Sequence, residues 1–276
     1  DILVIDEIHT LSENQITDVV NYINKHKIQK VLGLSGTISE DTRITLENRL
    51  KLKIIVNYPI EQAIDDGIIT DYRITVLTTP LDTNKNIKIK WSGGEFYTSE
   101  KMSFDRLTAK IGDLSTPAKS LKMLRLTRMS IIKKSASKIR LTKEVLSKLN
   151  THRVLVFTGL TDVADSLGIP SYHSKNSDEK IRDEFLNGKL DKLAIVNKLN
   201  TGTTFNKLNT AVVNFFDSNA ENMAQKISRI TCMEYDNLDK VANIIIICSD
   251  EDVEKRWLNK SLSFFVLIKI KWTKSL

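Results

Sequence analysis

Short apolar runs alternate with amphipathic stretches at the start of the chain. The run Ile2–Ile5 is followed by apolar residues at helical spacing, namely Ile16, Val19, Val20 and Ile23. Ser12 precedes that stretch and Gln15 follows three residues later, which is the capping-box pattern of a helix start. A second apolar run, Lys30–Leu34, precedes another helix, which is expected to begin at Ser39 with two acids in its first turn. The pattern predicts strand, helix, strand and helix in this order.

The same alternation returns after about residue 152. The predicted strands are Val154–Phe157, Leu193–Val196, Ala211–Phe215 and Ile244–Ile247. Helices are expected around 163–167, from Ser177, from about Asn219 and near 253–262. Strands that are apolar at nearly every position are buried on both faces, which is typical of parallel sheets covered by helices. We therefore predict an α/β fold with parallel-sheet domains in tandem.

The segment between these blocks has a different pattern. Residues 82–99 are rich in Asn, Lys and Gly and carry few signals of a buried strand, whereas the chain from Pro117 is helical in pattern and basic. We predict three parts: a first domain at 1–81, a connector with a helical insertion at 82–150, and a second domain at 151–276.

The charge balance favours a polyanionic partner. The 276 residues carry a net charge of +7, and the cations are spread along the chain rather than gathered in a tail. The basic segment Lys133–Lys148 is either a solvated charged face or a contact for a nucleic-acid backbone. In the second case, neutralising Lys133, Lys134 and Lys138 lowers the salt dependence of binding.

Composition argues against a zinc site, structural disulfides and a membrane span. The cysteines, Cys232 and Cys248, have no ligand spacing and suggest a reducing compartment, and the four histidines are scattered. The apolar run Ser263–Ile268 is too short and too close to lysines to span a bilayer, so a terminal strand is expected there. No signal peptide is readable, and we expect a cytoplasmic protein without a membrane or zinc partner. The oligomeric state is left open.

Two adjacent carboxylates, Asp6 and Glu7, directly follow the first predicted strand. A strand end of this kind can hold Mg²⁺ through water at Asp6, while Glu7 orients and polarises a water molecule that attacks a phosphate. The alternative is a solvated acidic loop. His9 follows the carboxylates, and Ser35-Gly36-Thr37 ends the next strand, where small hydroxyl residues could sense the state of the carboxylates. No GxxxxGK[ST] occurs in the sequence, and we expect a fragment that has lost its beginning.

These residues resemble motifs of the superfamily 2 helicases. Asp6–His9 is similar to the DEAD/DEAH box, and Ser35–Thr37 is similar to motif III, which is usually Ser-Ala-Thr. Tyr58–Ile69 resembles the segment that leaves the first RecA-like domain in phage and restriction-type helicases. The resemblance continues with Val154–Gly159 as motif IV, Lys198–Gly202 as motif V and Gln225–Arg229 as motif VI, so that it covers most of the chain.

The resemblance implies a fold of two RecA-like domains, the first incomplete, and a set of site residues. Glu7 and Arg229 would be catalytic, Arg229 as the arginine that stabilises the γ-phosphate. Gln225 and Gly202 would bind the nucleotide. Asp6 would hold Mg²⁺. The residues that would pass the state of the nucleotide site to the rest of the protein are His9, Ser35 and Thr37. ATP and Mg²⁺ are the implied cofactors.

The sequence departs from the family pattern at three positions. Cys232 stands where motif VI commonly has a second arginine, Ser228 stands where a glycine usually precedes the first arginine, and Thr204 stands where motif V often has an acid. Arg229 is therefore the remaining candidate for the arginine finger.

The resemblance implies an ATP-dependent DNA helicase or translocase, most like phage recombination helicases, which would place it in a host cytoplasm. DNA as the partner, rather than RNA, follows from the resemblance alone. One alternative is a nucleic-acid-binding module that has lost ATPase activity. Another is the motor part of a restriction or repair complex.

Overall fold

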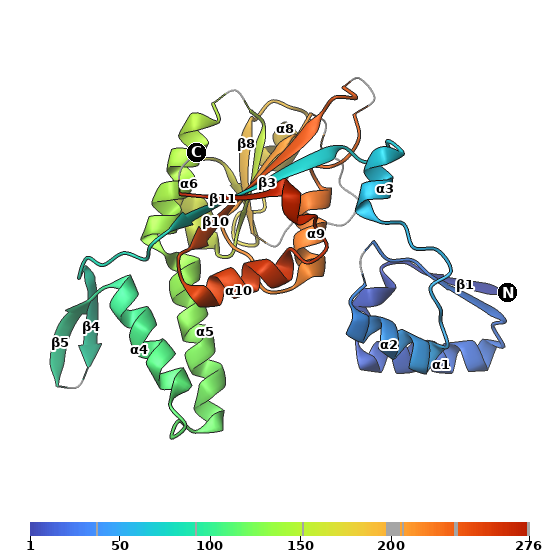
Figure 1. Cartoon of the computed structure of the whole chain (residues 1–276), viewed down its shortest axis with the longest axis horizontal. Helices are drawn as coiled ribbons and strands as arrows, with labels where there is room; N and C mark the ends of the chain where they lie inside the picture. The colour runs from blue at the N-terminus through green and yellow to red at the C-terminus, as the bar shows by residue number, and fades with distance from the viewer. Residues whose placement is uncertain are drawn as a thin grey trace. The chain divides into compact units, whose positions relative to one another are not determined.

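The computed structural model describes residues 1–36, 38–91, 93–150, 152–196, 205, 207–234 and 237–274, and for Trp91 only its backbone. The chain forms two compact units, Asp1–Ala63 and Ile64–Leu276 (Figure 1). This division differs from the predicted boundary after residue 81, because the strand β3 (Asp71–Thr79) pairs with strands of the second unit. The three-part division of the chain stays a prediction.

The first unit is a two-stranded parallel sheet with two helices. Strands β1 (Ile2–Ile5) and β2 (Lys30–Gly33) pair from Ile2↔Lys30 to Ile5↔Gly33. The remaining elements are η1 (Ile8–Thr10), α1 (Glu13–His26), α2 (Glu40–Leu50) and, at the boundary, α3 (Ile60–Asp65). The capping box at Ser12 is confirmed, since Ser12 and Gln15 each bond the other's backbone amide.

A small apolar core holds the first unit together. Ile8, Ile16 and Leu46 are buried in it, so η1, α1 and α2 pack on one face of the two strands. The side chains on the other face, Ile2, Val4 and Leu32, are exposed. A parallel sheet is usually covered by helices on both faces. The second face of this sheet is instead an apolar surface exposed to solvent.

A seven-stranded sheet forms the centre of the second unit, in the order β11-β3-β10-β9-β6-β8-β7. Besides β3, its strands are β6 (Val154–Thr158), β7 (Ser171–Tyr172), β8 (Lys192–Val196), β9 (Thr210–Val213), β10 (Val241–Ser249) and β11 (Ile270–Thr273). Every neighbouring pair is parallel. The predicted α/β class with a large parallel sheet is confirmed.

Helices on the two faces bury the central strands. They are α6 (Ala136–Lys148), α7 (Thr161–Ser166), α8 (Glu179–Leu186), α9 (Ala220–Ser228) and α10 (Asp252–Ser261). Val145 and Leu146 of α6 pack against Val156, Val212 and other apolar side chains of the sheet. All five residues of β6 are buried, as the uninterrupted apolar pattern predicts.

The region predicted as a connector contains a hairpin and three helices. Strands β4 (Ile87–Trp91) and β5 (Gly94–Thr98) pair antiparallel, and α4 (Glu100–Gly112) and α5 (Ala118–Lys134) follow as a packed pair. The few signals of a buried strand in 82–99 agree with this exposed hairpin, which lacks the apolar pattern of a buried strand and was not predicted. Helix α6 packs on β10 and β3 of the large sheet.

Lys138 of α6 is a buried residue and not a surface cation. Its side chain is 1% exposed and forms an ion pair with Glu254 of α10, which is 0% exposed. The prediction that Lys138 contacts a nucleic-acid backbone is therefore wrong, although Lys134 on the same basic segment is exposed. A sequence pattern shows a lysine's charge but not the carboxylate that pairs with it from a distant helix.

The final strand lies later than predicted. Phe265 packs edge-on against Tyr72 at a ring distance of 5.5 Å, and the 3-10 helix η2 (Leu267–Lys269) follows before β11. Within the apolar run Ser263–Ile268, Phe265 and Val266 thus contact Tyr72 of β3, and the strand pairing is made further on, by Ile270–Thr273. Among the described residues, no helix has the length and apolar character needed to cross a bilayer.

Candidate functional site

The predicted carboxylates lie in a tight turn at the carboxyl end of β1. Glu7 has a left-handed backbone, with φ 48°, and caps η1. The turn is fixed by two hydrogen bonds: the Glu7 amide donates to Asp6 Oδ1 at 2.9 Å, and Thr10 Oγ1 donates to the Glu7 carbonyl at 2.8 Å. Asp6 is exposed and Glu7 is half-buried. The turn therefore presents both carboxylates where a parallel sheet opens to ligands.

Backbone bonds continue past the strands and bring the end of β2 close to this turn. The Leu34 amide donates to the Ile5 carbonyl at 2.9 Å, and the Ile8 amide donates to the Leu34 carbonyl at 3.0 Å. Gly33 is required at this crossing, because a Cβ there would lie 2.7 Å from Ile8 Cδ1. As a result, Ser35 comes to lie beside the residues that follow Glu7.

His9 joins the two strand ends. Its Nδ1 lies 2.8 Å from Ser35 Oγ and 3.4 Å from Glu7 Oε2, and its side chain is 3% exposed. One ring nitrogen thus faces both a hydroxyl and a carboxylate. Unprotonated Nδ1 accepts a hydrogen bond from the hydroxyl, whereas protonated Nδ1 donates to the carboxylate, so the protonation of this nitrogen selects the partner. Thr37, the other predicted coupling residue, lies outside the described residues.

The predicted motif VI residues lie in the second unit. Gln225 is on α9, and Arg229 is the residue that caps its carboxyl end. Both are half-buried and share one face of the helix at a spacing of four residues. Gly202 and Thr204 of the predicted motif V fall in 197–204, outside the described residues.

Lys226, between the two predicted residues, is one that sequence reasoning missed. Its Nζ donates to the Phe215 carbonyl at 3.2 Å. Burial lowers the pKa of Lys226, and the nearby charge of Asp217 partly opposes this effect. The sequence carries no signal for this position, because burial of a lysine depends on the loop after β9 folding over α9.

Cys232, at the position where motif VI commonly has a second arginine, takes part in backbone pairing. Cys232 forms an isolated antiparallel bridge with Ile69, and its carbonyl accepts a hydrogen bond from Lys240 Nζ at 2.9 Å. Next to it, the Thr70 amide donates to the Thr231 carbonyl at 2.9 Å. The chain after α9 is therefore fastened to the segment that leads into β3.

The motif IV resemblance falls at the end of β6, in the centre of the sheet. Thr158 Oγ1 donates to the Ile195 carbonyl at 3.2 Å, and a Cβ at Gly159 would lie 2.6 Å from the Phe215 ring. Gly159 is therefore required for the close approach of the chain after β9.

The donor set of the first unit fits part of a Mg²⁺·ATP site. Paired carboxylates are the ligands that Mg²⁺ prefers when phosphates and water complete its coordination. Within the described parts of the chain, no three His, Cys, Asp or Glu side chains converge on a point that would hold a metal by themselves. The carboxylates of the first unit are suited to bind the metal and to orient the attacking water. The phosphates would need a separate loop of backbone amides, and the sequence has no GxxxxGK[ST] to supply it.

Comparison with known proteins finds similarity in fold. Neither a protein-family model nor a curated protein sequence matches the chain. Among solved structures, it is similar to S. cerevisiae Dbp5 bound to RNA and ADP BeF3, at 12% identity and a TM-score of 0.56 over 99% of this chain. It is also similar to the Pyrococcus furiosus Hef helicase domain, at 13% identity and a TM-score of 0.50 over 94% of this chain.

These likenesses define the class of fold. The chain spans 59% of the length of the Dbp5 chain and 73% of the Hef chain. At identities this low the comparison concerns the fold alone: the mixed α/β fold with a large parallel sheet is similar to that of these two helicase structures.

Proposed function

We propose that the chain is the motif-bearing part of an ATP-dependent helicase or translocase. The observation that carries the proposal is the contact of His9 with both Ser35 and Glu7. It joins the carboxylates of one strand end to the hydroxyl of the next, in the order in which the DEAD/DEAH box and motif III occur in this class. A solvated acidic loop, the alternative, gives no reason for a buried histidine between the two strand ends.

Each residue has a defined part in the proposed reaction. Asp6 holds Mg²⁺ through water, and Glu7 orients the attacking water and polarises it. Gln225 binds the nucleotide, and Arg229 stabilises the charge that develops on the γ-phosphate. Bound ATP supplies the phosphoanhydride bond whose cleavage drives the motor. A phosphate-cradling loop is needed in addition, and these 276 residues do not contain one.

His9 and Ser35 would transmit the state of the site. When Glu7 turns to the attacking water, Nδ1 of His9 is left to Ser35, and when Glu7 returns, the carboxylate competes for that nitrogen. The end of β2 thus has different hydrogen bonds in the two states. A small shift of this kind can select between two arrangements of a domain. Thr37 and Gly202 keep their proposed parts in coupling and nucleotide binding.

DNA is the proposed track, and a phage-type motor in a host cytoplasm is the proposed setting. Both follow from the resemblance of Tyr58–Ile69 to phage and restriction-type helicases. The fold similarity to an RNA-bound structure gives no support for DNA over RNA. Comparing single-stranded DNA with RNA of the same sequence as activators of ATP hydrolysis decides between them.

The test of the proposed function is nucleic-acid-stimulated release of phosphate from ATP by the intact protein that carries these residues. We expect Glu7→Gln to lower the stimulated rate by about 100-fold or more, because it removes the group that polarises water. Glu13→Gln is the matched control, since Glu13 is an exposed carboxylate of α1 and should leave the rate unchanged. Equal rates in the wild type and Glu7→Gln would remove hydrolysis from the proposal.

A second candidate is a nucleic-acid-binding module without ATPase activity. The observations that favour it are the lack of a GxxxxGK[ST] and Cys232 at the position of the second motif VI arginine. This candidate requires binding that is salt-sensitive, independent of ATP and unchanged in Asp6→Ala. The motor requires binding that changes with ATP and Mg²⁺.

A further inference from the structure

Three arginines gather where α5 meets α10 in the second unit. Arg125 and Arg128 lie on α5, and Arg256 lies on α10. Burial lowers the pKa of Arg128, and the positive charges of Arg125 and Arg256 lower it further. Arg128 is therefore close enough to Arg125 and to Arg256 to be repelled by both. Helix α5 adds to this charge, because it contains six lysines and arginines and no acid.

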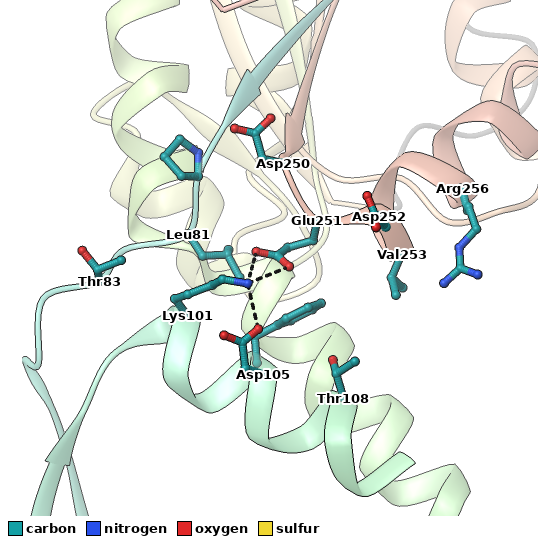
Figure 2. Close-up of a pocket in the computed structure, with 12 residues that line it drawn as sticks. Leu81, Thr83, Lys101, Asp105, Thr108, Asp250, Glu251, Asp252, Val253 and Arg256 are labelled. Carbon is teal, nitrogen blue, oxygen red and sulfur yellow. Dashed lines mark hydrogen bonds and ion pairs between the residues drawn. The ribbon is translucent and has the colours of Figure 1, made fainter. Parts of the chain in front are cut away.

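Three carboxylates of this region are paired with lysines, and Asp252, on the same helix as Arg256, is exposed. Lys101 contacts Asp105 at 2.7 Å and Glu251 at 3.1 Å, and Lys255 contacts Asp250 at 3.6 Å. Figure 2 shows Lys101 between Asp105 and Glu251, and draws no contact between Arg256 and the carboxylates beside it. Within the parts of the chain that the structure describes, none of the three arginines forms an ion pair.

Arg128 is fixed by contacts with its neighbours, yet one of its N–H groups has no hydrogen-bond acceptor. Its Nη1 donates to Thr108 Oγ1 at 3.3 Å, and its guanidinium lies 5.7 Å from the centre of the Phe104 ring. Its Nε is buried without an acceptor. A fixed guanidinium with an unused N–H and two positive neighbours is costly unless an anion binds there, because repulsion and lost hydrogen bonding are both uncompensated.

An apolar hollow adjoins the arginines on the α5 side. It has a volume of about 470 Å³ and includes Arg125, Leu126, Met129 and Trp257 among its lining residues. Trp257 is half-buried in its wall. An aromatic side chain beside cations is the combination that binds single-stranded nucleic acid, because bases stack on the ring and phosphates meet the charges.

We propose that Arg125, Arg128 and Arg256 bind a backbone phosphate of a single strand of nucleic acid, with a neighbouring base against Trp257. Arginine suits this task because its planar fork of N–H groups matches phosphate oxygens. Phosphate would neutralise the repulsion that Arg128 meets from Arg125 and Arg256. The inference rests on the proposed function only for the class of partner, since the binding needs no ATP.

The test is the affinity of the full chain for fluorescein-labelled single-stranded oligo(dT), measured by anisotropy without nucleotide over a range of salt concentrations. Arg125→Gln/Arg256→Gln changes two exposed side chains and leaves the packed Arg128 in place. We expect about a ten-fold loss of affinity, and a salt slope lower by up to about 0.7, since one neutralised phosphate of a single strand contributes about 0.7. Unchanged affinity and slope would overturn the assignment.

A matched control removes the same charge at the opposite edge of the sheet. Lys180 and Lys189 are exposed in and just after α8, beside the edge strand β7, so Lys180→Gln/Lys189→Gln should change affinity little. An equal loss in the control would mean that overall charge, and not the arginine cluster, determines binding. Competition by polyglutamate as strong as that by unlabelled oligo(dT) would likewise overturn the assignment to nucleic acid.

Trp257 provides a second readout of location. In Trp91→Phe/Trp272→Phe it is the remaining tryptophan of the sequence, and we expect oligo(dT) to quench its emission. Binding by anisotropy without this quenching would place the strand elsewhere and refute the proposal.

The outcomes separate the two proposals. If Arg125→Gln/Arg256→Gln weakens binding but Glu7→Gln leaves ATP hydrolysis unchanged, the phosphate site is supported and the motor function is refuted. If Glu7→Gln abolishes hydrolysis but the arginine variant binds normally, the motor function is supported and the phosphate site is refuted.

Discussion

His9 is the residue on which the account of the first unit depends. Buried histidines commonly serve packing, but this one contacts a hydroxyl and a carboxylate through the same nitrogen. One nitrogen cannot accept from the hydroxyl and donate to the carboxylate at the same time, so the contact to one weakens when the other strengthens. The geometry therefore couples the side chain of Glu7 to that of Ser35 through one atom, which is a simple way to report whether Glu7 is engaged.

The buried pair of Lys138 and Glu254 allows a prediction about stability. Lys138→Met should destabilise the second unit by about 3–5 kcal/mol, because it leaves the Glu254 carboxylate buried without its counter-charge. The measurement is urea unfolding followed by circular dichroism. Adding Glu254→Gln to Lys138→Met should recover part of the loss, since the neutral amide can still accept from the Ser249 amide.

Lys148→Met is the matched control on the same helix. Lys148 pairs with Glu144 at the surface, where an ion pair contributes less than about 1 kcal/mol. If Lys138→Met cost no more than Lys148→Met, the ion pair between α6 and α10 would be no more important than a surface one.

At the scale of elements, the sequence predicted well where burial and local bonding agree. Helix α1 follows from its capping box and apolar spacing, and β6 follows from five apolar or small residues buried on both faces. The hairpin β4–β5 was missed because its residues are exposed, and β11 was placed too early because the apolar run before it packs on Tyr72 without strand pairing. The pattern of apolar and polar residues along the chain indicates which side chains are buried. Strand pairing at a sheet edge depends in addition on residues that are distant in the sequence.

The edge strand β11 allows a prediction of pH dependence. Lys269, just before β11, forms an ion pair with Asp71 of β3, and this element holds the edge of the sheet. Burial acts to raise the pKa of Asp71, but the hydrogen bonds from Lys269 and the Tyr72 amide outweigh it and lower the pKa. A lowered pKa stabilises the fold above the unfolded value, near 4, and this stabilisation is lost as the pH falls through the folded value.

Asp71→Asn should therefore lower the melting temperature at pH 7 by up to about 3 °C, since the pair is partly exposed and contributes at most about 1 kcal/mol. The difference from the wild type should shrink as the pH falls below about 4. The control is Asp239→Asn, an exposed carboxylate in a turn. A difference that persists in acid would mean that Asp71 stabilises the edge without its charge.

At the scale of the whole molecule, the sequence predicted which residues meet within the first unit but not the arginine cluster. Parallel neighbouring strands end at the same edge, so residues after β1 and after β2 had to be close. Arg128 and Arg256 are far apart in the sequence and come near each other because α5 packs near α10. Helix α5 has six lysines and arginines and no acid, which indicated a charged face but did not show that one of its arginines has a buried Nε without an acceptor.

The two units carry different parts of the proposed machine. The first contains the carboxylates and their histidine relay, and the second contains Gln225, Arg229 and the proposed phosphate site. In a motor, ATP hydrolysis at one site changes the affinity for nucleic acid at another site. We propose that the hydrogen bonds of His9 are the first to change in this coupling.

The measurement that tests this account most directly is the ratio of strand displacement to ATP hydrolysis in the intact protein, for wild type, Ser35→Ala and Ser35→Thr. The account predicts that Ser35→Ala keeps hydrolysis within about three-fold but lowers strand displacement about ten-fold or more, because the partner of His9 is gone while Glu7 remains. Ser35→Thr keeps a hydroxyl and should restore the ratio. A ratio that is the same in Ser35→Ala and the wild type would contradict the account.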